Sequence, residues 1–201
     1  MRATTHAQRI LRLASQRGLL RARDLARDHI PRATLSRLVA SGQLTQVSRG
    51  LYALPKQARS GHHQLAEIAA RSPQSVFCLL TALRFHQLTT QSPHEVWLAI
   101  PNKAHAPRLD YPPLRIVRFS GPSLTEGVES HTVDGMAIRV YSVAKTVADC
   151  FKYRNKIGLD VALEALRECR REKRASNDEL WHYARLCRVA NVMRPYLESI
   201  R

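Results

Sequence analysis

The chain has 201 residues, 44% of them hydrophobic, so it can bury one large core or two smaller ones. Its 32 Lys and Arg against 16 Asp and Glu give a formal net charge of +16. No apolar run approaches the roughly eighteen residues of a membrane-spanning helix, and no signal-peptide pattern opens the chain. We therefore expect a cytoplasmic protein. Four widely separated cysteines without a CxxC pair predict structural thiols, not a zinc site or a disulfide framework: Cys78, Cys150, Cys169 and Cys187.

The positive charge is concentrated at the N-terminus. Residues 1–58 hold eleven Lys and Arg against only Asp24 and Asp28, a net charge of +9, whereas the longer remainder has +7. Such density favours a polyanionic partner, because Lys and Arg that neutralise phosphates release counterions. We predict double-stranded DNA and not a membrane surface, since the helices have no wide apolar face with Trp or Phe to insert.

Three short helices are predicted in this basic segment. Apolar residues at helical spacing indicate the first two over residues 5–17 and 21–29, the first closed by Gly18. The third begins at Pro31, which suits a first helical turn, and ends at Gly42. Its apolar stripe leaves a small, basic outward face, which is typical of a helix that enters a major groove.

A hairpin follows the third helix. Residues 44–47 and 51–54 are β-prone runs separated by Ser48, Arg49 and Gly50, and glycine there permits a positive φ. Read alone, this segment is equally compatible with a solvated surface loop. The three preceding helices favour a winged helix-turn-helix, in which the hairpin is the wing.

The recognition helix and the wing supply the predicted DNA contacts. Arg32 and Arg37, assisted by Thr34 and Ser36, are expected in the major groove. Gln46, Ser48 and Arg49 are expected on the DNA backbone or in the minor groove.

After a polar linker at residues 56–61, the composition changes to a mixed pattern. Helices are predicted over residues 62–71 and 75–88, and a proline-rich loop over 102–113. Asp134–Gly135 between two β-prone runs is the strongest hairpin signal in the chain. Four strands are expected to form a small, mostly antiparallel sheet: residues 95–100, 114–119, 128–133 and 136–141.

The last third is predicted to be helical. Ser142 caps a helix through Lys152, a second runs from Leu159 to about residue 170, and Ser176 or Asn177 caps a third. Residues 189–200 form the last helix. The chain is therefore predicted to be α+β, with a DNA-binding domain at residues 1–58 and a second domain at residues 59–201.

Sequence signatures of catalysis were searched for and not found. The chain has no GxxxxGK[ST], no GxGxxG after a strand, no GxSxG and no HExxH. A nuclease would need clustered acidic residues to hold a divalent ion, and the acids near the strands form no such arrangement. His62–His63 is interpreted as solvent-exposed. We expect no enzyme activity, no cofactor and no metal.

The order of these parts resembles that of a known protein family. Five segments carry this resemblance: SRGLYALP at the wing, SVFCLLTALRFHQL, EVWLAIP, the DG hairpin, and VYSVAKTVADCFKYRNKIGLDVALEALRE. Together, over about residues 5–190, they resemble the AbiEi antitoxins of type IV toxin–antitoxin systems, which act in phage abortive infection. The resemblance implies an N-terminal domain that binds inverted repeats in its own promoter and represses it. It also implies a C-terminal domain that neutralises a nucleotidyltransferase-like toxin and supports cooperative DNA binding.

The second domain therefore has a candidate partner surface. Four basic positions in the matching segment are Lys145, Lys152, Arg154 and Lys156. An ordinary solvated face is the simpler interpretation of them. Three functional hypotheses remain: an autoregulating antitoxin, a plain transcriptional repressor whose second domain serves dimerisation or ligand sensing, and a nuclease.

Overall fold

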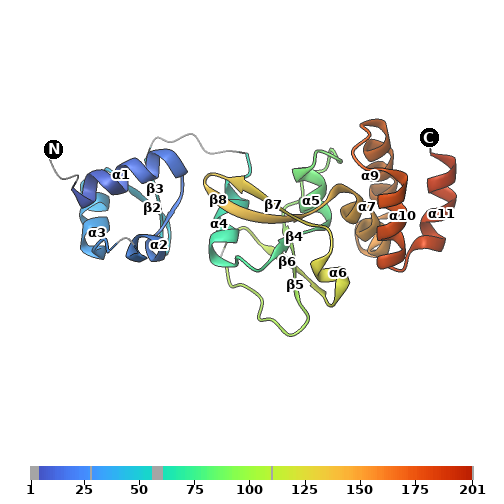
Figure 1. Ribbon diagram of the computed structural model, residues 1–201, viewed down its shortest axis with the longest axis horizontal. Coiled ribbons are helices and arrows are strands. Elements are labelled where there is room, and N and C mark those ends of the chain that lie inside the picture. The colour runs from blue at the N-terminus through green and yellow to red at the C-terminus, as the bar shows by residue number, and fades with distance from the viewer. Residues whose placement is uncertain (1–4, 28, 56–60, 110, 201) are drawn as a thin grey trace. The chain divides into compact units, whose positions relative to one another are not determined.

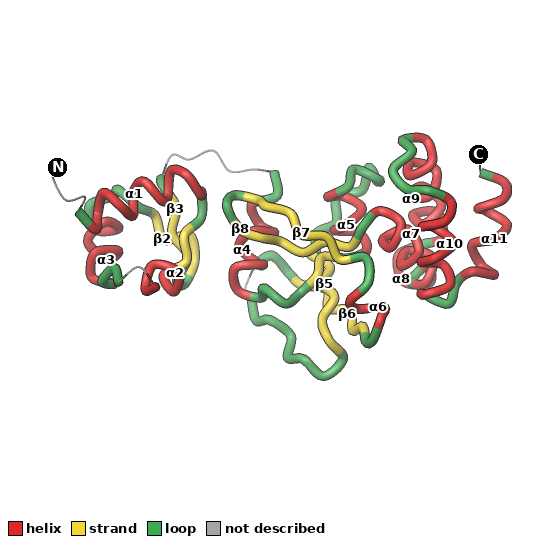
Figure 2. The backbone as a smooth tube through the Cα atoms, in the orientation of Figure 1, coloured by secondary structure: helices red, strands yellow, loops and turns green. Residues whose placement is uncertain are grey.

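The computed structural model describes residues 5–27, 29–55, 61–109 and 111–200 (Figure 1, Figure 2). Backbone contacts divide the chain into two compact units. Unit 1 joins residues 1–73 with 131–138, and unit 2 joins residues 74–130 with 139–201. The predicted linker, residues 56–61, lies outside the described residues except for Gly61, so a domain boundary at residues 58 and 59 stays a prediction.

Unit 1 begins with three short helices, α1 (His6–Arg17), α2 (Ala22–Arg27) and α3 (Arg32–Ala40). A capping box opens α1, because the Thr5 side chain accepts from the Gln8 backbone N–H and the Gln8 side chain accepts from the Thr5 N–H. As predicted, α3 starts directly after Pro31, and the chain leaves it through Gly42 at φ +69°. The helices enclose a small core formed by Ile10, Ala14, Leu20, Leu25, Ile30, Leu35, Leu38 and Leu44.

The wing is part of a three-stranded sheet of β1 (Leu20–Arg21), β2 (Thr45–Ser48) and β3 (Leu51–Ala53), in the order β1-β3-β2. The hairpin β2–β3 is the predicted one, with Gly50 at φ +75° in its turn. β1 was not predicted; it pairs Leu20 with Tyr52 in antiparallel register. Three helices and a paired wing confirm the predicted winged helix-turn-helix.

The second sheet has five strands: β4 (Val76–Phe77), β5 (Val96–Pro101), β6 (Leu114–Phe119), β7 (Val128–Val133) and β8 (Met136–Tyr141). Their order is β6-β5-β4-β8-β7. β4 pairs antiparallel with β5 and parallel with β8, and β5 pairs parallel with β6. The α+β class is confirmed, but the sheet is mixed and not mostly antiparallel. The long segment 102–113 explains this, because about a dozen residues suffice for a crossover between parallel strands.

The prediction of a helix over residues 75–88 was wrong for the first residues of that range. Val76 and Phe77 form β4, and the helix α5 (Leu79–Phe85) begins only after Cys78. Both strand residues are fully buried, in the middle of the sheet. A strand that is covered on both faces gives a continuous apolar run, which periodicity cannot distinguish from a buried helix.

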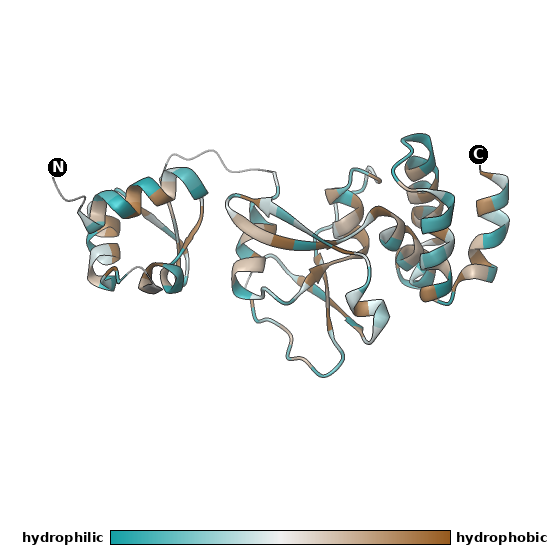
Figure 3. Cartoon of the chain, in the orientation of Figure 1, coloured by the Kyte–Doolittle hydropathy of each residue, from teal (hydrophilic) through white to brown (hydrophobic). Residues whose placement is uncertain are grey.

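The remaining helices are α4 (His63–Arg71), α6 (Pro122–Thr125), α7 (Val143–Lys152), α8 (Arg154–Ile157), α9 (Leu159–Arg171), α10 (Asn177–Leu186) and α11 (Ala190–Ser199). Two of the predicted caps are present. Ser142 accepts from the Lys145 backbone N–H at the start of α7, and Ser176 caps α10. Figure 3 shows α9 and α10 as mostly hydrophilic ribbons with hydrophobic patches, as expected for amphipathic helices at a surface.

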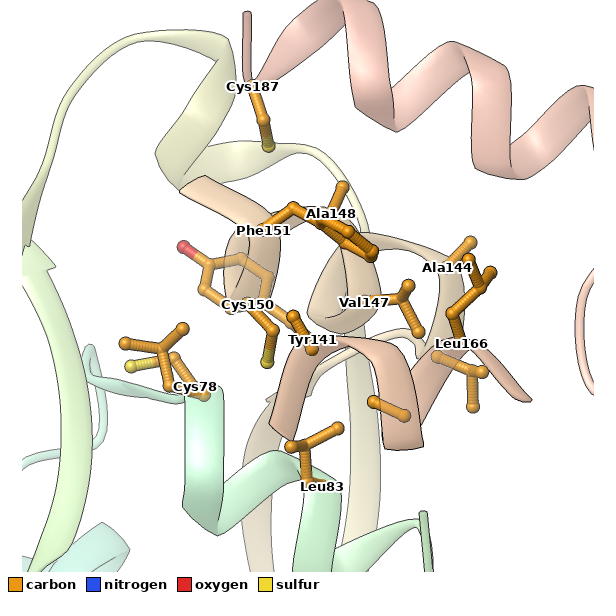
Figure 4. Packing of buried hydrophobic residues seen from close by; sticks show 14 of the residues in the cluster. Cys78, Leu83, Tyr141, Ala144, Val147, Ala148, Cys150, Phe151, Leu166 and Cys187 are labelled. Atoms are coloured by element: carbon orange, nitrogen blue, oxygen red, sulfur yellow. The ribbon is translucent and has the colours of Figure 1, made fainter. Parts of the chain in front are cut away.

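The core of unit 2 surrounds α7. Residues 143–151 of this helix are all buried. Figure 4 shows Leu83 of α5, Val147 of α7 and Leu166 of α9 within one apolar cluster. All four cysteines are free and buried, as a structural role requires. The buried helix α7 therefore packs against α5 and α9 at the centre of the unit 2 core.

The cap of α10 gives a first prediction. Ser176 Oγ accepts from the Glu179 N–H at 3.2 Å, and the Glu179 carboxylate accepts from the Ser176 N–H at 2.8 Å, which lowers the pKa of Glu179. Ser176→Ala should lower the free energy of unfolding by about 1 kcal/mol in urea titrations at neutral pH. Because the folded pKa of Glu179 is the lower one, its contribution is present above its unfolded pKa and is lost on acidification. Ser199→Ala at the end of α11 is the control, and an equal loss in both variants would contradict the capping role.

Candidate nucleic-acid interface

The outward face of α3 carries small and basic side chains. Its exposed residues are Arg32, Ala33, Ser36, Arg37 and Ala40. Leu35 and Leu38 are buried on the opposite face, and Thr34 is half-buried at the edge. Short side chains let a helix backbone approach the floor of a groove, while arginine reaches base edges beyond them.

The turn between α2 and α3 fixes the position of this face. Ile30 is buried, and its backbone N–H donates to the Leu25 carbonyl at 3.3 Å. His29, just before it, adopts φ +55°, which reverses the chain direction. Buried side chains on both helices therefore set the orientation of the exposed face of α3.

The wing presents only part of the predicted set. Gln46 and Arg49 are exposed, and a bulge interrupts the pairing between Gln46 and Ser48. The Ser48 hydroxyl is buried and has no hydrogen-bond partner among the described residues. The Ser48 hydroxyl is therefore not available to DNA in this conformation, which corrects the prediction for this residue.

The start of α3 and the tip of the wing come together. Arg32 and Arg49 line the same open hollow, although they lie far apart in the sequence. The backbone N–H of Ala22 donates to the Gly50 carbonyl at 2.9 Å, which ties the wing tip to the start of α2. Two predicted contact residues thus share one surface, whereas Arg37 lies about one and a half turns along α3 from Arg32.

The winged helix also matches a known family. Residues 8–55 match the family model described as transcriptional regulator, AbiEi antitoxin, a range that reaches from α1 through the wing. Over these residues the chain is similar to the AbiEi antitoxin regulators. The match ends before α4, and the search of curated proteins found no match to the chain.

In the winged helix, two further arginines lie beside the predicted contact residues. Arg21 and Arg23 line the hollow with Arg32 and Arg49. Arg21 also pairs with Asp24, its Nε lying 2.7 Å from Oδ2. Neither was predicted as a site residue, although the density of arginine in residues 1–58 was a signal for them. Arg21 lies in β1, which was not predicted, and Arg23 lies in α2 directly after it.

The candidate partner positions of the second half lie in different environments. Lys152 and Lys156 are exposed, with their Nζ atoms over the rings of Phe119 and Tyr153 at 5.8 and 5.7 Å. The Arg154 guanidinium donates to the Phe151 carbonyl at 3.0 Å and is only partly exposed. The two lysine ammonium groups contact aromatic rings and the arginine contacts a backbone carbonyl, and the exposed parts of these side chains can still contact a partner.

Lys145 is not a surface residue, which corrects its prediction as a partner contact. Its side chain is fully buried, with Nζ 2.6 Å from Asp149 Oδ2 and 4.3 Å from the centre of the Tyr141 ring. The sequence indicated only that Lys145 and Lys152 lie on one helix; the packing of α10 against α7 and of the Tyr141 ring of β8 against Nζ covers Lys145. Lys145 is therefore part of the core of unit 2 and does not present charge to a partner.

The Lys145–Asp149 pair has a third member. The Cys187 thiol donates to Asp149 Oδ1 at 3.2 Å, so both carboxylate oxygens are satisfied. Burial raises the pKa of Asp149 and outweighs the opposite effect of Lys145. Burial also raises the pKa of Cys187 to about 12, with the Asp149 charge acting in the same direction. Cys187 is therefore a neutral hydrogen-bond donor and not a reactive thiolate.

Metal-binding clusters and membrane-spanning helices are both absent from the described part of the chain. There, no group of three or more His, Cys, Asp or Glu side chains is arranged to hold a metal ion. Within the same residues, none of the helices has both the length and the apolar content to cross a lipid bilayer.

Proposed function

We propose that this protein is a DNA-binding autorepressor and antitoxin, which represses its own promoter and neutralises a nucleotidyltransferase-like toxin of the same operon. The observation that carries the proposal is the small, basic, exposed face of α3 beside a basic wing, in a winged helix that matches the AbiEi regulators. Residues 1–58 are proposed as the DNA-binding domain and residues 59–201 as the antitoxin domain. No catalytic role is assigned to either.

We assign each proposed DNA contact from the position of the residue on the winged helix. We assign Arg37, with Ser36 and Thr34, to base edges in the major groove, because they lie on α3 beyond its first residue. Arg49 is assigned to the DNA backbone, and so is Arg32, in place of the major-groove contact predicted from the sequence, because the two share one hollow; Gln46 is assigned to the wing contact. Inverted repeats in the promoter would place two copies of the winged helix on one duplex.

The antitoxin role rests on the family and on the exposed cations of unit 2. Lys152, Arg154 and Lys156 are the proposed partner positions, without Lys145. Because the family match ends at residue 55, the alternative is a plain repressor whose second half serves dimerisation or ligand sensing. A nucleotidyltransferase-like gene next to this one favours the first function, and its absence favours the second.

A test on DNA addresses the repressor role. In gel-shift titrations of the full chain at two salt concentrations, the promoter duplex should bind about a thousandfold or more tightly than a random duplex of equal length. The salt dependence should be steep for both duplexes, since both contain the same phosphates. Equal affinity for the two would remove specific repression from the proposal.

A separate test addresses the antitoxin role. The cognate toxin is expressed from an unrelated promoter, together with the full chain or with Arg37→Ala. Both forms should rescue growth at unchanged toxin levels, because the substitution lies on α3 and outside unit 2, whereas only the unsubstituted chain should repress its own promoter. Failure of the full chain to rescue would refute the antitoxin role and leave the plain repressor.

A further inference from the structure

The hollow in unit 1 is lined by more basic residues than the winged helix alone supplies. It measures about 430 Å³ and is lined by five arginines: Arg21, Arg23, Arg32, Arg49 and Arg71. Arg71 is the last residue of α4, a helix that follows the winged helix in the chain and lies beyond the residues that match the family. All the lining residues belong to unit 1.

The charge of the hollow is largely uncompensated. Asp24 pairs with Arg21, but among the described residues the other four guanidinium groups make no ion pair with a carboxylate. These four side chains are all exposed, so they reach solvent and not the protein interior. Like charges that line one hollow repel one another, and an anion between them would relieve the repulsion.

The backbone at the start of α3 also favours an anion in the hollow. Arg32 is the first residue of α3, and no side chain caps that end of the nine-residue helix. The first N–H groups of a helix and its dipole both favour negative charge. Guanidinium groups bind phosphate oxygens in a bidentate manner, so the hollow combines two kinds of phosphate-binding group.

We infer that this hollow binds a backbone phosphate of duplex DNA, and that Arg23 and Arg71 extend the DNA interface beyond the recognition helix and the wing. The inference rests on the proposed DNA-binding function and adds two residues to it. A phosphodiester is favoured over a small soluble anion because the hollow is open and lies between the first residue of α3 and the tip of the wing. In a winged helix these two places flank the groove that the recognition helix enters.

Salt dependence of binding gives the test. Arg23→Gln and Arg71→Gln in the full chain should each weaken binding about tenfold, to promoter and random duplexes alike. Each should also reduce the slope of log Kobs against log salt by about 0.9, because one phosphate contact is lost. Arg71→Lys keeps the charge and should retain the slope. Arg12→Gln on α1, exposed and outside the hollow, is the matched control and should change neither quantity.

A neutral phosphate analogue locates the contact. Methylphosphonate substitution of single phosphates at the edge of the promoter site should identify one position where Arg71→Gln has no additional effect, since the interaction is already removed. Additive losses at every position would overturn the inference. Inorganic phosphate serves as the second probe: if the wild-type chain binds it and Arg71→Gln abolishes that binding without changing the salt slope on DNA, the hollow is a free-anion site and the inference fails.

The inference and the proposed function fail in distinguishable ways. If promoter and random duplexes bind equally well, specific repression fails, yet the salt slopes of Arg23→Gln and Arg71→Gln still test the hollow on either duplex. If promoter binding is specific but these variants match Arg12→Gln, the repressor stands and the hollow carries no phosphate. Circular dichroism of each variant confirms that the fold is retained.

Discussion

Lys145→Ala should lower the free energy of unfolding of unit 2 by about 3–5 kcal/mol, because it leaves the buried Asp149 carboxylate without its cation. The only tryptophans, Trp97 and Trp181, lie in unit 2, so their fluorescence in a urea titration reports on this unit. The double variant Lys145→Met with Asp149→Leu removes both charges. It should recover most of the loss, since well-packed apolar residues often replace a buried ion pair without cost.

The pH dependence of the destabilisation by Lys145→Ala distinguishes the effect of the unpaired Asp149 charge from the effect of lost packing. Burial raises the pKa of Asp149, so the folded state binds the proton more tightly than the unfolded state. Without Lys145 this imbalance grows, and the destabilisation should be smaller near pH 5 than near pH 8, by about 1.4 kcal/mol for each unit of additional pKa shift. A loss that is independent of pH and persists in the double variant would show that the missing Lys145 volume, not the unpaired charge, is responsible.

Arg37→Ala should weaken promoter binding by about 1–3 kcal/mol and relax the sequence preference, because a bidentate contact to a base edge is lost. Affinity is measured by gel shift on the promoter and on a random duplex. Only the promoter affinity should fall substantially, so the ratio between the two narrows.

Arg49→Ala at the wing tip is the matched comparison for Arg37→Ala. It should weaken binding to both duplexes alike and flatten the salt slope by about one, as expected for a phosphate contact. If Arg37→Ala behaves in the same way as Arg49→Ala, α3 does not read bases through Arg37, and the assignment of the recognition face is wrong.

Sequence patterns located most of the helices because helix signals are local. The apolar stripe Leu35, Leu38 and Val39 and the closing Gly42 were sufficient to place α3. Ser142 and Ser176 marked the starts of α7 and α10 through the same local chemistry of capping. The hairpin at Asp134–Gly135 is equally local: both residues have a positive φ, as the turn requires.

The candidate site was predicted less completely. Arg32, Ser36, Arg37, Gln46 and Arg49 are exposed as expected, and their contacts with DNA remain predictions. The Ser48 hydroxyl is buried, and so is the whole Lys145 side chain. Neither outcome could be read from spacing, because spacing assigns a residue to one side of a strand or helix but does not show what covers that side.

By itself, then, the sequence located most of the helices and the tight turn at Asp134–Gly135, and it determined that the fold is α+β and that the basic N-terminal part is a winged helix. Only the tertiary structure decided the two-residue strands β1 and β4, the burial of Lys145 against Asp149, and the convergence of Arg23, Arg32, Arg49 and Arg71 on one hollow. The physical reason is the range of the interactions. Capping and helical periodicity act over about four residues, whereas strand pairing and burial depend on segments that are distant in the sequence.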